Sequence, residues 1–156
     1  MIKGKYIGGD GDLSEPFSVR REVFCDEQGI SPDAEFDSMD KYAVHAIVYG
    51  EAGTPVATGR ITFDGKTYML GHIAVIKSAR KSGYGDFTVR MLLDRAFMNG
   101  AHTVHVHAQL HAVPFYEKLG FTVCGDEMSE KGLPHLPMCL ELKNVKSGCG
   151  HNCFSK

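Results

Sequence analysis

The spacing of hydrophobic and polar residues changes repeatedly along this 156-residue chain, from a helical period to a strand period and back. Such alternation indicates a mixed α+β domain. Helical spacing begins at Ser14, the expected N-cap, and continues to Gly29, a residue suited to the end of a helix. Residues 83–99 and 112–119 show the same period, and each is followed by a glycine. We therefore expect three helices.

Strand-like segments occupy most of the remaining chain. Three of them, 42–49, 56–63 and 67–76, follow one another through short turns, which predicts an antiparallel meander. The dipeptide Asp64-Gly65 is a strong hairpin signal, and Gly71 indicates a bulge or a close backbone approach. Further strands are expected over 3–7, 103–108, 121–124 and 137–142, the last two joined by an irregular polar connection.

Charge and length narrow the class of protein. The chain has 17 basic and 19 acidic residues, and its net charge of −2 excludes the broad basic field of a general nucleic-acid binder. It lacks the roughly 20 consecutive apolar residues that span a bilayer. No apolar segment follows the basic N-terminus, so we expect a cytoplasmic protein without a membrane partner. No linker divides the chain, which predicts one domain over 1–145 and an acidic, polar loop over 31–40.

The remaining residues, 146–156, form a cysteine-containing tail. Cys149, His151 and Cys153 are potential zinc ligands, but three ligands so close together do not close a tetrahedral site on their own. Farther back, His105 and His107 share one strand face, yet Gln109 interrupts that series. In a reducing compartment, cysteines behave as small hydrophobic side chains. We therefore expect no metal.

The segment between the third meander strand and the long helix carries a more specific pattern. Strand residues Ile73-Ala74-Val75 lead to the loop Arg80-Lys81-Ser82-Gly83-Tyr84-Gly85, and a helix begins at once. The glycines let the backbone turn tightly, while free N–H groups and the helix dipole attract an anion such as pyrophosphate. The spacing is neither a Walker loop nor G-x-G-x-x-G. The alternative is a glycine-rich loop that only turns a corner.

A second motif lies about thirty residues farther on, at Phe115-Tyr116-Glu117-Lys118-Leu119-Gly120-Phe121. Together with Arg-x-x-Gly-x-Gly at 80–85, it resembles the GNAT superfamily of acetyl-CoA-dependent N-acyltransferases, over nearly the whole chain. Residues 23–30 and 132–135 are similar to a subset of small bacterial-type members related to glucosamine-phosphate N-acetyltransferases. The resemblance implies the acyl-CoA N-acyltransferase fold. In that fold, helices flank a mixed, mostly antiparallel sheet of six to seven strands whose central strands splay apart.

The resemblance also implies acetyl-CoA as cosubstrate and assigns its contacts. Main-chain groups of Ile73, Ala74 and Val75 would meet the pantetheine arm and the acetyl carbonyl, with an N–H near Val75 as oxyanion donor. Gln109 stands where many members have an asparagine touching the cofactor arm. The pyrophosphate would lie in the loop made of Arg80, Lys81, Ser82, Gly83, Tyr84 and Gly85.

By the same resemblance, Tyr116 lies near the thioester sulfur and donates a proton to the departing thiolate. A thiol has a pKa near 8.5 and a phenol one near 10, so this transfer is not strongly uphill. The alternative is that Tyr116, beside Phe115, is only a buried aromatic residue.

An amine acceptor needs a base, because at a pKa around 10.4 only about one in a thousand amines is neutral at pH 7. Some family members use a glutamate on a central strand, but none lies between Arg60 and Val75. A histidine or a water relay is therefore favoured. The sequence does not name the base: the candidates by type are Glu27, His72, His111 and His135. We place His72 in the catalytic site, since it immediately precedes the oxyanion strand. The alternative for each histidine is a structural hydrogen bond.

The expected function is direct acetyl transfer to the primary amine of a small molecule, such as glucosamine or its 6-phosphate. Glu27 and Arg60 are assigned to the acceptor, because the planar guanidinium of Arg60 suits an anionic or hydroxylated group. A polyamine, an antibiotic or a protein lysine is an alternative acceptor. A non-catalytic acyl-CoA sensor and a nucleotide-binding domain are alternative classes. Exposed strand edges would allow a homodimer.

Overall fold

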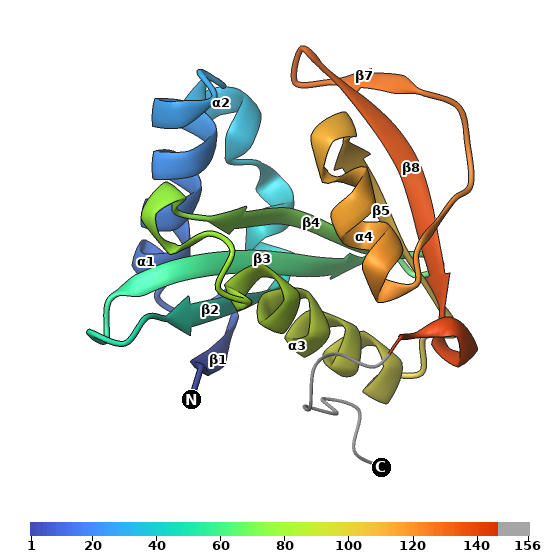
Figure 1. Ribbon diagram of the computed structural model, residues 1–156, viewed down its shortest axis with the longest axis horizontal. Coiled ribbons are helices and arrows are strands. Elements are labelled where there is room, and N and C mark those ends of the chain that lie inside the picture. The colour runs from blue at the N-terminus through green and yellow to red at the C-terminus, as the bar shows by residue number, and fades with distance from the viewer. Residues whose placement is uncertain (147–156) are drawn as a thin grey trace.

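A computed structural model describes residues 1–146 as one twisted sheet with helices on both faces (Figure 1). The predicted tail cysteines, Cys149 and Cys153, lie outside the described residues. The strand order is β1-β2-β3-β4-β5-β8-β6, with β7 paired to β8. The strands are β1 Lys3–Gly8, β2 Val44–Tyr49, β3 Pro55–Phe63, β4 Tyr68–Val75, β5 Thr103–Gln109, β6 Thr122–Val123, β7 Met128–Glu130 and β8 Leu133–Glu141.

The first half of the sheet is the antiparallel meander that the sequence predicts. Strands β1 to β4 pair in chain order, each antiparallel to the one before. Gly65 adopts a φ of 95° in the hairpin between β3 and β4, a left-handed conformation that glycine adopts easily. The α+β class and the mostly antiparallel sheet are therefore confirmed, with eight strands instead of six to seven.

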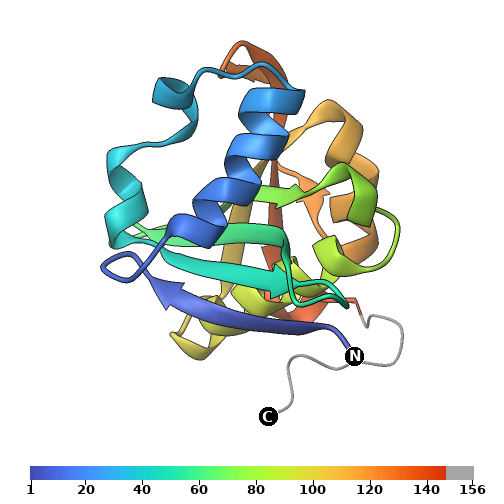
Figure 2. The ribbon, with the colours of Figure 1, turned by 90° about the vertical axis from the view of Figure 1, so that its left-hand side faces the viewer.

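Helices pack on both faces of the sheet. Helix α3 (Tyr84–Met98) and helix α4 (Val113–Leu119) supply Leu92 and Leu119 to the larger core cluster on one face. Helix α1 (Ser14–Arg20) continues as the π-helix η1 (Arg21–Glu27), which packs Val23 and Phe24 on the other face (Figure 2). No helix among residues 1–146 is both long and apolar enough to span a bilayer.

The first helical segment departs from the prediction in two details. Its N-cap is Leu13 rather than Ser14, whose N–H instead donates to the Asp12 carboxylate. Its second half is a π-helix, in which the Gln28 N–H donates to the carbonyl of Val23, five residues earlier. Apolar spacing indicates a helix but does not distinguish these two hydrogen-bond patterns.

The predicted acidic loop over 31–40 is wrong, because this segment is folded. It contains α2 (Pro32–Glu35) and most of the 3₁₀-helix η2 (Ser38–Tyr42), capped by Ser31 and Asp37. The second half of the sheet also departs from expectation. The irregular polar connection contains β7, and β8 begins at Leu133 rather than at residue 137.

The two halves of the sheet meet at a short parallel seam and then diverge. Strands β4 and β5 pair only through Tyr68–Val104, Met69–His105 and Leu70–Val106. Beyond Leu70 the register of β4 against β3 shifts. Gly71 pairs with Arg60 and Ala74 pairs with Thr58, so β4 advances three residues where β3 advances two. The predicted bulge near Gly71 and the splayed central strands are both confirmed.

Candidate functional site

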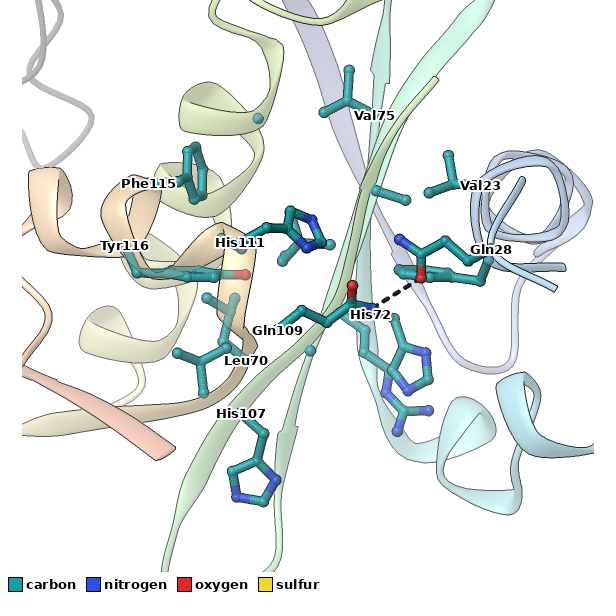
Figure 3. Close-up of a pocket in the computed structure, with 18 of the residues that line it drawn as sticks. Val23, Gln28, Leu70, His72, Val75, His107, Gln109, His111, Phe115 and Tyr116 are labelled. Carbon is teal, nitrogen blue, oxygen red and sulfur yellow. Dashed lines mark hydrogen bonds between the residues drawn. The ribbon is translucent and has the colours of Figure 1, made fainter. Parts of the chain in front are cut away.

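A cleft of about 1000 Å³ opens where β4 and β5 diverge. Its walls come from β4, β5, η1, α4, the loop before α3 and the β7–β8 hairpin. Nearly all residues assigned from the sequence line it: Glu27, Arg60, His72, Ile73, Ala74, Val75, Arg80, Lys81, Gly83, Tyr84, Gly85, Gln109 and Tyr116. Ser82 is the exception. Figure 3 shows Tyr116, His72 and Gln109 arranged around this space.

Strand β4 turns main-chain groups toward the cleft beyond its bulge. The Ile76 N–H donates to the Val56 carbonyl of β3 at 2.9 Å. Because antiparallel partners alternate, the main-chain groups of Val75 point away from β3, toward the gap between the strands. The Val75 carbonyl accepts a bond from Arg80 Nε at 2.9 Å. The Val75 N–H is thus directed to the position expected of an oxyanion donor.

Backbone strain in the described chain is concentrated at this cleft. Three non-glycine residues of the described chain have a positive φ: His72 (54°), Lys81 (65°) and Lys131 (55°). All three line the cleft. Such conformations cost free energy and persist where surrounding contacts enforce them, often at functional sites.

The loop from Arg80 to Gly85 forms a turn at the N-terminus of α3. Gly83 has a φ of 89°, and its carbonyl accepts the helix bond from Phe87 at 3.0 Å. The N–H groups of the first helical turn precede this bond and are available to a ligand. A Cβ on Gly85 would lie 3.4 Å from both Phe115 and Val75, so a side chain there would enter the cleft. The loop fits an anion held by main-chain donors.

The Arg80 side chain is already engaged. Its two terminal nitrogens bind the carboxylate of Glu27 at 2.7 and 2.6 Å. This ion pair lowers the pKa of Glu27 and raises that of Arg80. Arg80 therefore fixes η1 to the end of β4, and both assigned side chains, Glu27 and Arg80, form one contact at the rim.

Tyr116 presents its hydroxyl to the cleft from α4 (Figure 3). Phe115 and Phe121 hold its ring edge to face at centroid distances of 5.0 and 5.4 Å. Burial raises the pKa of Tyr116, so the phenol stays protonated at neutral pH. The arrangement fixes the phenol in an apolar surrounding, and its raised pKa makes it a weaker acid than the free phenol considered in the sequence analysis.

Gln109, at the end of β5, is bonded across the cleft. Its Nε2 donates to Oε1 of Gln28, the residue that ends η1, at 3.0 Å (Figure 3). In this view the bond separates Val75 and Phe115 from His72 and His107. We call these two regions the donor side and the acceptor side of the cleft.

His72 is fixed by a buried carboxylate that the sequence analysis did not assign. Its Nδ1–H donates to Glu35 Oε2 at 2.5 Å, and Glu35 is fully buried. Burial, together with the nearby guanidinium groups of Arg20 and Arg60, outweighs Glu35 and lowers the pKa of His72 to about 4. His72 is therefore neutral at pH 7, with Nε2 as a hydrogen-bond acceptor. Burial alone would raise the pKa of Glu35, but hydrogen bonds from His72 and Lys131 lower it.

Arg20 and Arg60 belong to a buried network of ion pairs. Arg20 binds Glu35 at 2.8 Å and Asp40 at 2.7 Å. Arg60 binds Asp40 and Asp37, each at 2.7 Å. Despite burial, these two guanidinium groups lower the pKa of Asp40 to about 2. The Arg60 guanidinium thus lines the cleft with its charge already paired.

The opposite wall of the acceptor side comes from β5 and the β7–β8 hairpin. Lys131, at the hairpin tip, extends its ammonium to Glu35 Oε1 at 2.8 Å. Glu130 accepts a bond from His107 Nδ1 at 3.2 Å and lies 3.8 Å from His135 Nε2. His111, another candidate base, is exposed on the donor side (Figure 3).

Sequence reasoning assigned no role to Gln28, Lys131 and Glu130. It treated Glu35 and Asp37 only as part of an acidic loop that could attract a cationic amine or be merely solvated. A partial signal for the network exists in the sequence. Arg20 lies in phase with Phe17, Val23 and Phe24 on the apolar helix face, and a charge there requires a buried counter-charge. Nothing local identifies Glu130, because its position depends on the fold of the hairpin.

Comparisons with known proteins show the family. The Acetyltransferase (GNAT) domain family matches residues 14–142. YyaT of Bacillus subtilis, an uncharacterized protein, is 37% identical over 88% of this chain and 95% of its own length. The uncharacterized N-acetyltransferase YjcF of the same organism is 36% identical over 88% and 98%.

Solved structures share the fold. ElaA of Escherichia coli superposes with a TM-score of 0.79 at 23% identity, over 90% of this chain and 100% of that one. An acyl-CoA N-acyltransferase from Pseudomonas aeruginosa gives 0.76 at 23% identity, over 89% and 99%. The narrower resemblance to glucosamine-phosphate N-acetyltransferases stays a prediction. The chain belongs to the GNAT acetyltransferase family and is an acyl-CoA-dependent acetyltransferase.

Proposed function

We propose that this enzyme transfers the acetyl group of acetyl-CoA directly to the primary amine of a small molecule. The observation that carries the proposal is the position of Tyr116 and the Val75 N–H on the donor side, with His72 on the acceptor side of one cleft. A proton donor, an oxyanion donor and a proton acceptor are the groups that aminolysis of a thioester requires.

The charges around the cleft support this orientation. Lys81 and Lys118 line the cleft and have no carboxylate partner among the described residues, which suits the phosphates of a coenzyme A moiety. On the acceptor side, including the network behind it, three cationic side chains face four carboxylates. They are Arg20, Arg60 and Lys131 against Glu35, Asp37, Asp40 and Glu130. A cationic amine is favoured there.

Each assigned residue then has a role. Acetyl-CoA supplies the thioester, and the Val75 N–H stabilises the charge that develops on its carbonyl oxygen. With a pKa of about 4, His72 cannot deprotonate a free ammonium of pKa near 10.4. It accepts the proton after attack, when the bonded nitrogen is far more acidic. Tyr116 donates its proton to the departing sulfur, and Gln109 orients the cofactor arm.

The paired arginines support an acceptor without phosphate. Arg20 is buried against Glu35 and Asp40, and Arg60 is bound by Asp37 and Asp40. Arg21 does not line the cleft. Among the acceptors predicted from the sequence, glucosamine therefore fits better than its 6-phosphate. The homodimer and the cytoplasmic location stay predictions.

The test measures thiol release from acetyl-CoA with a panel of primary amines. Tyr116→Phe should lower kcat by about 100-fold, because general acid catalysis contributes at least that much, while KM for acetyl-CoA changes little. Tyr42→Phe is the matched control, since Tyr42 is exposed and outside the cleft. An unchanged kcat in Tyr116→Phe would remove the tyrosine from the mechanism. Tight acetyl-CoA binding without turnover of any amine would instead indicate a sensor.

A further inference from the structure

The acceptor side contains two histidine–carboxylate pairs with the same unusual geometry, and the inference drawn from them rests on the proposed function. In the first pair, His72 donates its Nδ1–H to Glu35, so Nε2 of the neutral ring is an acceptor. That nitrogen lies 3.9 Å from Asp37 Oδ2. Two hydrogen-bond acceptors therefore face each other at the cleft.

The second pair lies on the opposite wall. His135 donates Nδ1–H to the carbonyl of Leu133 at 2.9 Å, which again leaves Nε2 as the acceptor. That nitrogen lies 3.8 Å from Glu130 Oε2, another acceptor. The His135 side chain is only 5% exposed and lines the cleft, yet no described residue donates a hydrogen bond to its Nε2. This nitrogen is open to the cleft and can accept a hydrogen bond from a ligand.

An ammonium group is the donor that fits both pairs. Charge-assisted N–H···O bonds are about 2.7–2.9 Å long, so one nitrogen can bond two acceptors that lie 3.8 or 3.9 Å apart. The described residues contain no His, Cys, Asp or Glu group arranged to hold a metal ion. Moreover, Glu130 is the acceptor-side carboxylate that has neither an arginine nor a lysine partner in the described chain.

Lys131 indicates the distance between the two walls. It follows Glu130 at the hairpin tip, where Lys131 and Gly132 both have positive φ values in the two-residue turn. Its side chain crosses to the first wall, where Nζ binds Glu35 and lies 3.3 Å from His72 Nδ1. A lysine side chain has a four-carbon stem. A flexible aliphatic chain of similar length therefore connects the two walls.

We propose that the acceptor is a small aliphatic diamine. One amine is held between His72 Nε2 and Asp37, where it is acetylated, and the second stays an ammonium between His135 Nε2 and Glu130. The first amine binds as an ammonium and loses one proton to solvent before it reacts, because an ammonium has no lone pair. The neutral nitrogen then forms a bond to the acetyl carbon and loses a second proton to His72. The carbon–sulfur bond breaks, and the sulfur takes the Tyr116 proton. The Glu130 subsite makes no covalent contribution; it recognises charge.

The experiment compares 1,4-diaminobutane with n-butylamine, which has the same chain and lacks the second charge. For the native enzyme, KM for the diamine should be lower by at least about tenfold, the effect of one hydrogen bond to a charged group. Glu130→Gln should remove this difference by raising KM for the diamine and leaving that for butylamine unchanged. Glu127→Gln, three residues earlier, exposed and outside the cleft, is the control and should behave like the native enzyme.

Other outcomes separate this subsite from the proposed function. Equal KM values for both amines in the native enzyme, or an equal effect of Glu130→Gln on both, would overturn the diamine proposal while acetyl transfer stands. If neither amine is acetylated, calorimetric titration of the enzyme–coenzyme A complex with 1,4-diaminobutane still tests whether the Glu130 subsite binds the diamine. Binding that Glu130→Gln weakens about tenfold supports the subsite, and binding that it leaves unchanged refutes it.

Discussion

Replacing Arg20 by methionine would isolate the energetic role of the buried network. The side chain is 1% exposed, and it donates to Glu35 Oε2, the Glu35 carbonyl and both Asp40 oxygens. Methionine has a similar length but no charge. The substitution would leave Glu35 and Asp40 buried with one cation fewer, although Lys131 and Arg60 still bind them.

The expected loss of stability at pH 7 is about 3–5 kcal/mol, the range measured when one partner of a buried ion pair is removed. Arg21→Met is the matched control. Arg21 is the next residue along the chain, it is exposed, and its described contact is a cation–π approach of 5.1 Å to Phe36. That change should alter the free energy of unfolding by less than about 1 kcal/mol. Urea unfolding followed by far-ultraviolet circular dichroism measures both, since the chain has no tryptophan.

The pH dependence provides the test of cause. Without the Arg20 guanidinium, the cost of burying the Glu35 and Asp40 carboxylates is less well offset. The pKa values of both groups in the folded variant should therefore rise. Protonation then relieves the unpaired charge, and the stability gap between native protein and variant should narrow as the pH falls from 7 to about 4. A gap that is small at pH 7, or one that does not change with pH, would refute the electrostatic explanation and point to packing alone.

Three further predictions follow from the same structure. Gly59→Ala should lower the free energy of unfolding by about 2 kcal/mol, because its Cβ would lie 2.3 Å from Ile73 Cδ1. Urea unfolding measures this loss, and Gly71→Ala is the control, because a Cβ there meets nothing within 4 Å. The folded pKa of Asp40 is about 2 against 3.8, so Asp40 should account for about 2 kcal/mol of the unfolding free energy that the native protein loses as the pH falls from 5 to 2, a contribution that Asp40→Asn lacks. Gly85→Val should raise KM for acetyl-CoA at least about tenfold without changing the melting temperature, and an unchanged KM would place the cofactor elsewhere.

Periodic features of the fold could be predicted from the sequence. The meander follows from alternating residues and the Asp64-Gly65 turn, and the long helix follows from apolar spacing after the glycine loop. These signals are local, because each reflects how a short segment meets a single core. Most of the cleft lining could be assigned for a related reason. Its backbone and glycine residues lie in continuous motifs at 73–75 and 80–85.

The acceptor side could not be predicted in this way. Residues 33–40 are rich in acidic side chains, a pattern typical of a solvated loop, and Arg20 and Arg60 are among the distant partners that hold Glu35 and Asp40 in the interior. Those arginines come from another helix and another strand. The position of Glu130 likewise depends on β7, a strand too short to show a period.

The short seam between β4 and β5 divides the sheet into two antiparallel halves. Each half is held by long antiparallel ladders, whereas three residue pairs join the halves. Past the seam, Gln28–Gln109 and Glu35–Lys131 are two side-chain contacts between the facing walls. Small rotations of one half against the other therefore change the width of the cleft without breaking a ladder. In a hydrogen-exchange experiment, amides along the ladders should exchange only through global unfolding, with an opening free energy equal to that of the whole protein. Amides at the mouth of the cleft should exchange through local opening, which costs less free energy.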